Sequence, residues 1–145
     1  MQGPGRESGA LSFSGDANET TMTELPIPLP QRLLGAVGGL LCAGSVGLAA
    51  YASHGAMGLA QQRLGTAALF AFAHGLALVA LAPAARGILA RLALGTLLVG
   101  VALFSGSLAA AVFVGTPTRL APLGGSALMV GWVLWSVGSL LRRRG

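Results

Sequence analysis

From residue 33 onward, the chain alternates long apolar runs with short segments that hold most of its polar residues. The four apolar runs cover about residues 33–52, 64–82, 92–114 and 122–141. Each run has about 20 residues, enough for a helix to cross a hydrocarbon core of about 30 Å. Every backbone amide in lipid needs a partner within its own segment, so we expect α-helices. The pattern predicts an all-α integral membrane bundle of four helices, with short connections and antiparallel neighbours.

The chain before these runs has a different character. It is rich in Gly, Ser, Thr and Asn and ends with alternating prolines at 26–30, which favour an extended spacer. We therefore expect a disordered leader over 1–31 and a membrane domain over 32–145. Met22 is a candidate second translation start. A cleaved signal peptide ending near 50–52 is disfavoured, because this leader is too long and too acidic for a signal sequence.

Charge is scarce and unevenly distributed. Charged residues make up 9% of the chain and the mean hydropathy is +0.76, whereas a soluble domain carries about a quarter charged residues. All the acidic residues precede position 25, and beyond them every charged residue is an arginine. The net charge of +5 does not indicate nucleic-acid binding, because most arginines stand singly between apolar runs. The composition indicates a lipid bilayer as the partner and excludes nucleic acid.

The arginines also predict an orientation. Two of them, Arg63 and Arg119, flank one side of a four-pass arrangement. The other side is flanked by Arg32, Arg86, Arg91, Arg142, Arg143 and Arg144. Under the positive-inside tendency, this asymmetry predicts that both termini lie in the cytoplasm.

Small residues recur at helical spacing in every apolar run. Because apolar burial cannot drive helices together inside lipid, faces of small residues that allow close packing are typical of helix contacts. The expected packing positions are Gly35, Gly39, Ala43 and Gly47 in the first run, Ala67, Ala71 and Gly75 in the second, Ala102, Gly106 and Ala110 in the third, and Gly124, Ala127, Gly131 and Gly138 in the fourth. These stripes favour a compact bundle, with a stripe left over for self-association.

Few polar residues lie within the runs. His74 lies near the middle of the second run beside the small-residue stripe, so we expect it to face protein. An ionisable group at that depth is a functional candidate, and the alternative is a neutral histidine bonded to a neighbouring helix, for instance to Ser105 or Ser107. His54, at the end of the first run, is expected to be a solvated or capping residue at the membrane surface.

No set of residues indicates a reaction or a cofactor. Two histidines at different depths fit haem ligation poorly, and without nearby carboxylates or thiolates they fall short of a metal site. Ser105 and Ser107 lack an acidic partner for a catalytic triad. The single cysteine, Cys42, is expected to be a buried apolar side chain. We therefore expect neither an enzyme nor a bound cofactor.

Four short motifs together resemble a known family. They are Ala-Ser-His-Gly-Ala at 52–56, Ala-His-Gly-Leu-Ala-Leu at 73–78, Leu-Phe-Ser-Gly-Ser-Leu at 103–108, and Leu-Ala-Pro-Leu-Gly-Gly at 120–125 followed by Gly131-Trp132. Their order and spacing resemble the YgdD-like family of small inner-membrane proteins of unknown function, which has an animal mitochondrial relative. The resemblance covers about residues 32–141. It implies four helices in a bacterial inner membrane and assigns no catalytic residue, ligand or substrate.

Two functional hypotheses remain open. The first is a non-enzymatic membrane protein that acts by helix–helix contact, as an accessory subunit, an assembly partner or a homo-oligomer. The alternative is a small carrier, channel or proton-linked transporter that uses His74. Trp132 and Trp135 in the fourth run are expected to serve as packing or lipid contacts.

Overall fold

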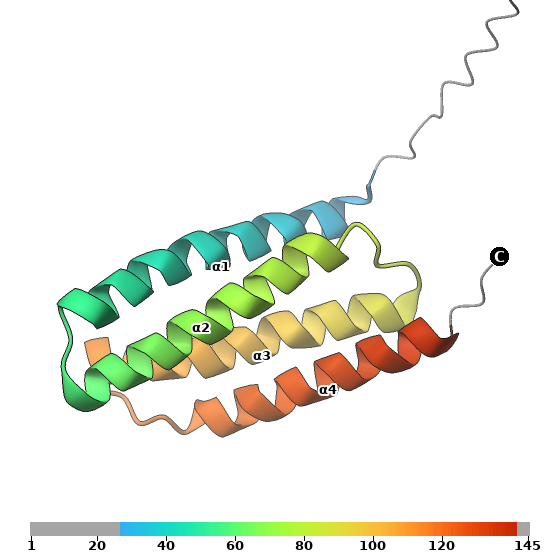
Figure 1. The fold of residues 1–145 in the computed structure, drawn as a ribbon. Coiled ribbons are helices and arrows are strands. Elements are labelled where there is room, and N and C mark those ends of the chain that lie inside the picture. Colours follow the sequence, from blue (N-terminus) through green and yellow to red (C-terminus); the bar gives the residue numbers. More distant parts are fainter. Residues whose placement is uncertain (1–26, 142–145) are drawn as a thin grey trace, which may run out of the picture.

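The computed structural model describes residues 27–141, and four α-helices follow one another within them (Figure 1). They are α1 (Leu29–His54), α2 (Gly58–Leu81), α3 (Ile88–Phe113) and α4 (Leu120–Leu141). Their 22 to 26 residues correspond to about 33–39 Å of helix, and all four are long and apolar enough to cross a membrane. The four-helix prediction is confirmed. The leader up to residue 26 and the arginines at 142–144 lie outside the described residues.

All four helices begin earlier than the apolar runs suggested. Helix α1 begins at Leu29 rather than 33, so the last residues assigned to the leader are helical. Polar residues such as Gln31 and Arg91 fit into first turns because long side chains extend along the helix toward the membrane surface. Pro30 is tolerated there because the first amides of a helix need no partner within it. Apolar content alone therefore underestimates the helix lengths.

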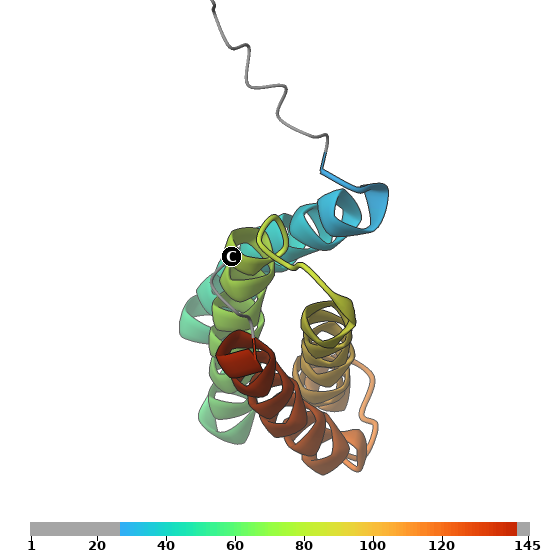
Figure 2. The ribbon, with the colours of Figure 1, turned by 90° about the vertical axis from the view of Figure 1, so that its right-hand side faces the viewer.

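The helices pack in sequence order, each against the next. Helix α1 packs on α2, α2 on α3, and α3 on α4. Figures 1 and 2 place α1 and α4 at opposite edges of the arrangement. The start of α1, the α2–α3 loop and the end of α4 share one end of the bundle, and the other two loops share the opposite end (Figure 1).

The core lies mainly among α2, α3 and α4. Its largest fully buried side chains are Leu64, Leu78, Leu94, Leu97 and Val101. The outer faces are also apolar, because many large side chains such as those on α1 and α4 are exposed. Leu40, for example, is 73% exposed and Val130 is 53% exposed. Such continuous exposed apolar surface on all four helices suits contact with lipid rather than with water.

Glycines allow the closest helix contacts. Helices α1 and α2 meet at Gly38 and Gly75, where a methyl group on Gly38 would lie 2.6 Å from the Gly75 carbonyl oxygen. Helices α3 and α4 meet at Gly100 and Gly124, where a methyl group on Gly124 would lie 2.8 Å from the Gly100 carbonyl oxygen. Only glycine fits at these crossings, since real Cβ atoms do not approach other heavy atoms so closely. Close backbone contact of this kind is the usual basis of helix association in lipid.

Candidate functional site

The polar centre of the bundle is built around His74. This residue lies on the inner face of α2 with Ala71, Gly75 and Leu78, and its side chain is 8% exposed. Its Nδ1 lies 2.8 Å from the carbonyl oxygen of Phe70, one turn earlier in the same helix. Its Nε2 accepts a hydrogen bond of 3.2 Å from the indole Nε1–H of Trp132 in α4.

The two bonds define the tautomer of His74. The carbonyl oxygen of Phe70 can only accept, so Nδ1 must carry a proton and donate it. The indole N–H of Trp132 can only donate, so Nε2 must present its lone pair. This assignment follows from the hydrogen-bond network. His74 is therefore a neutral imidazole whose two nitrogens are both engaged.

Aromatic rings surround this histidine. Phe70 stacks on the imidazole, with ring centroids 5.7 Å apart and an interplanar angle of 14°. Phe104 of α3 contacts Phe70 at 4.5 Å, and the Trp132 ring lies 6.1 Å from His74. The cluster of Phe70, His74, Phe104 and Trp132 thus connects α2, α3 and α4. The contacts within this cluster stabilise the packing of these three helices against one another.

Ser105 and Ser107 are buried in α3, at 7% and 8% exposure. One alternative for His74 was a neutral histidine bonded to a neighbouring helix, with Ser105 or Ser107 as the example; in the structure the bond to another helix is made with Trp132 of α4. The Ser105 hydroxyl has no hydrogen-bond partner among the described residues. From the sequence, Trp132 was expected to be a packing or lipid contact; the signal that could have identified it is its indole N–H, which usually finds an acceptor when it is placed against protein.

His54 lies far from this cluster. It is the last residue of α1 and its side chain is exposed. His74 lies about 24 Å along α2 from that helix's start, which follows His54 by one short loop. The two histidines therefore lie at different depths. Among the described residues, no group of three or more His, Cys, Asp or Glu is placed to hold a metal ion.

Cys42 of α1 is free and half-buried. Its thiol lies 3.6 Å from the carbonyl oxygen of Phe72 in α2, within reach of a weak S–H···O contact. Cys42 therefore belongs to the interface between α1 and α2.

Two of the four small-residue stripes face the protein. In α2, Ala67, Ala71 and Gly75 are buried. In α4, Gly124, Gly131 and Gly138 are buried, and Ala127 beside them is half-buried. These positions bring α2 against α1 and α4 against α3.

The stripes of α1 and α3 face away from the rest of the chain. Gly39, Ala43 and Gly47 are exposed, Gly35 is half-buried, and a methyl group on any of the three glycines would meet nothing within 4 Å. In α3, Ala102 and Gly106 are exposed and Ala110 is half-buried. Helix α1 instead packs through Gly38 and α3 through Gly100. The sequence indicated one stripe left over for self-association; in the structure, two stripes, those of α1 and α3, face away from the other helices.

The four apolar helices and their exposed apolar faces define a multi-pass helical membrane protein. The chain belongs to the family described as "Protein of unknown function (DUF423)", which matches residues 48–125, more than half of its length. The match runs from the end of α1 into the start of α4 and includes both histidines and both buried serines of α3. No curated protein matches the chain, and no solved structure matches it.

Proposed function

We propose that this protein is a non-enzymatic component of a bacterial inner membrane that acts by helix–helix contact, as an accessory subunit, an assembly partner or a homo-oligomer. The observation that supports this function is the open small-residue face of α1. This face consists of Gly35, Gly39, Ala43 and Gly47, and no other part of the described chain covers it.

Helix α1 is the least covered of the four. In its most apolar 18-residue stretch, only 11% of the residues are buried, compared with 39% in the corresponding stretch of α2. Its buried residues Gly38, Ser45 and Ala52 recur every seven positions and form one narrow contact line with α2. The small-residue face lies on the other side. In lipid, a second helix can approach such a face closely enough for strong van der Waals contact.

The arrangement of arginines supports cytoplasmic termini as part of this proposal. Arg32, Arg86 and Arg91 lie at the end of the bundle where α1 begins, and Arg63 and Arg119 lie toward the other end. Positive charge concentrates on the cytoplasmic side of multi-pass proteins. We also propose that the chain belongs to the YgdD-like group, because its four motifs follow one another in the order and spacing of that group.

The alternative, transport through His74, receives less support from the geometry. Both imidazole nitrogens are bonded, to Phe70 and to Trp132. A group that carries protons or binds a substrate needs a free nitrogen and a path to water. Such pathways are usually lined by intramembrane acidic residues, and this chain has none after Glu24.

Site-specific photocrosslinking in native membranes tests the proposal. Benzoylphenylalanine replaces Ala43 at the centre of the open face, or Val130 in the middle of α4 as the matched control. Both residues are exposed and lie at about the middle of their helices. The proposal predicts an adduct of defined protein mass from position 43 and none from position 130, and mass determination then separates a second copy from another protein. Equal yields at the two positions, or no protein adduct at 43, would overturn it.

A further inference from the structure

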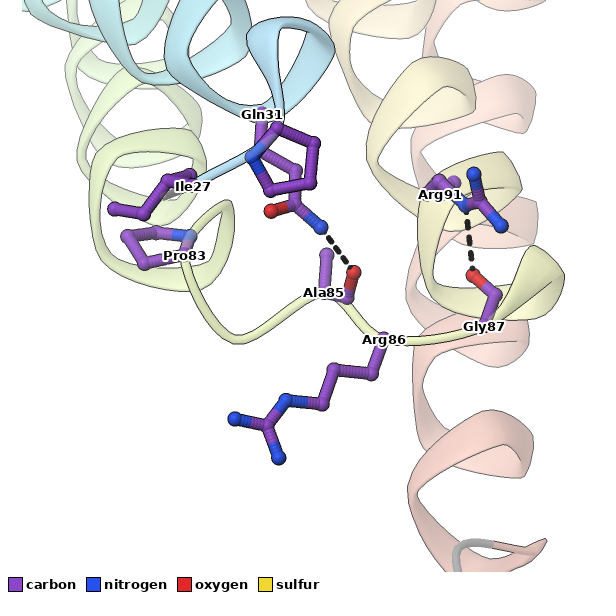
Figure 3. A pocket seen from close by; sticks show the side chains of 8 residues that line it. Ile27, Gln31, Pro83, Ala85, Arg86, Gly87 and Arg91 are labelled. Atoms are coloured by element: carbon purple, nitrogen blue, oxygen red, sulfur yellow. Dashed lines mark hydrogen bonds between the residues drawn. The ribbon is translucent and has the colours of Figure 1, made fainter. Parts of the chain in front are cut away.

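A hollow of about 760 Å³ lies at the end of the bundle where α1 begins (Figure 3). Its wall comes from the first turn of α1, the α2–α3 loop and the first turn of α3. The residues that line it include Ile27, Gln31, Ala85, Arg86, Gly87 and Arg91. Its volume falls within the range of ligand-binding clefts.

Several hydrogen bonds hold the wall in place. The side-chain Nε2 of Gln31 donates a hydrogen bond to the Ala85 carbonyl oxygen at 2.5 Å (Figure 3). This bond connects the start of α1 to the α2–α3 loop. The Ala85 and Arg86 amides donate to carbonyl oxygens within the loop at 3.2 and 2.9 Å. Gly87, with φ at 86°, occupies the left-handed region and turns the chain into α3. These bonds hold the α2–α3 loop in a defined conformation at one side of the hollow.

The hollow is positively charged. Arg86 and Arg91 both line it, and no Asp or Glu occurs among the described residues, 27–141. The Nε–H of Arg91 donates to the Gly87 carbonyl oxygen at 3.2 Å, which fixes the stem and leaves the terminal nitrogens to bind an anion (Figure 3). The unpaired amides in the first turn of α3 add partial positive charge on the same side.

An apolar groove continues from Arg91 toward the membrane interior. A second hollow of about 370 Å³ lies along α3 and is lined by Arg91, Leu92, Gly95, Thr96 and Val99. Arg91 is shared by the two hollows. Gly95 leaves space in the groove, since a methyl group there would meet nothing within 4 Å. A cationic hollow at the membrane surface that shares Arg91 with a neighbouring apolar groove fits a molecule with a phosphate head and a hydrocarbon tail.

We propose that the two hollows form one binding site for an anionic phospholipid. The Arg86 and Arg91 side chains extend in different directions (Figure 3). Arg91, which lines both hollows, binds the headgroup phosphate, and the long side chain of Arg86 adds positive charge at the rim. One acyl chain lies along Leu92, Gly95 and Val99. Guanidinium groups suit this role because they bind phosphate oxygens in a bidentate manner. Basic sites between membrane helices are known to bind anionic lipid headgroups.

The test measures binding of phosphatidylglycerol and, separately, inorganic phosphate to the detergent-purified full chain, by native mass spectrometry and titration. Arg86→Gln combined with Arg91→Gln is expected to weaken phosphatidylglycerol binding about 25-fold, because each arginine near a membrane surface contributes about a factor of five. Arg63→Gln combined with Arg119→Gln, at the opposite end, is the charge-matched control and leaves binding unchanged. Equal binding by the two double variants would overturn the site.

A second variant separates a lipid from a free anion. Gly95→Leu fills the groove and leaves both arginines in place, so it is expected to weaken phosphatidylglycerol binding severalfold. Phosphatidylcholine, with no net charge, is expected to bind less tightly than phosphatidylglycerol. If inorganic phosphate competes fully and Gly95→Leu changes nothing, the ligand is a free phosphate and the lipid proposal is wrong. Unchanged melting temperatures of the variants establish that the fold is intact.

Discussion

The contact between Gly38 and Gly75 gives the sharpest prediction about stability. A methyl group on Gly75 would lie 2.7 Å from the Gly38 carbonyl oxygen, 2.9 Å from the Cys42 sulfur and 3.0 Å from the Leu41 Cβ. Only the sulfur can move by rotation, because the other two atoms are fixed to the backbone of α1. Gly75→Ala therefore forces α1 outward by roughly 0.5–1 Å, which weakens the dispersion contacts along the interface. Overpacking of this kind costs about 1–3 kcal/mol.

Gly65 is the matched control for this change. It lies in the same helix, and a methyl group there would meet nothing within 4 Å. Replacing glycine by alanine stabilises a helix by about 0.5–1 kcal/mol, and this gain is common to both variants. The difference between Gly65→Ala and Gly75→Ala thus isolates the packing cost of about 1–3 kcal/mol.

The assay is equilibrium unfolding in mixed detergent micelles, followed by circular dichroism. Gly75→Ala is expected to unfold at a lower denaturing-detergent fraction than Gly65→Ala. Gly38→Ala should behave like Gly75→Ala, since its methyl group would lie 2.6 Å from the Gly75 carbonyl oxygen. Equal stability of Gly75→Ala and Gly65→Ala would refute the close approach of α1 and α2.

Three further substitutions test individual polar side chains. Trp132→Phe keeps an aromatic ring but removes the donor to His74, and it is expected to lower the free energy of unfolding by about 0.6–2 kcal/mol in the same micelle assay. Ser105→Ala removes a buried hydroxyl without a partner in the described chain, so unfolding measurements should show unchanged or higher stability. Gln31→Leu removes the bond to Ala85, and hydrogen exchange of the α2–α3 loop is expected to become faster, whereas unchanged exchange would contradict the role of Gln31.

The sequence contained enough information for the four helices but not for all of their limits. Length and the absence of charge are sufficient to predict spans, because lipid leaves the helix as the only form that pairs every amide. The starts of α1 and α3 were missed because Gln31 and Arg91 were taken as residues outside a helix. Their long side chains allow the backbone to be helical while the polar ends reach the surface.

The candidate site could be predicted only in part. The small residues beside His74 indicated that it lies on the inner face of α2. This could be predicted because the positions that share a helix face follow from residue spacing within that helix alone. Its partner, Trp132, is separated from it by 58 positions, and the choice between α3 and α4 depended on how the helices pack. The open face of α1 could not be predicted either, because Gly38 and Gly39 are adjacent and only the contact with α2 distinguishes them.

The central claim, that four helices cross a membrane, is tested most directly by labelling the three loops from one side of sealed vesicles. Single cysteines at Met57, Ala84 and Thr116 are introduced after Cys42→Ala removes the chain's only cysteine. Met57 and Thr116 lie in loops at one end of the bundle, and Ala84 lies in the loop at the other (Figure 1). An impermeant maleimide should label Met57→Cys and Thr116→Cys alike and Ala84→Cys only from the opposite side. Equal labelling of all three from one side would contradict the four-span arrangement.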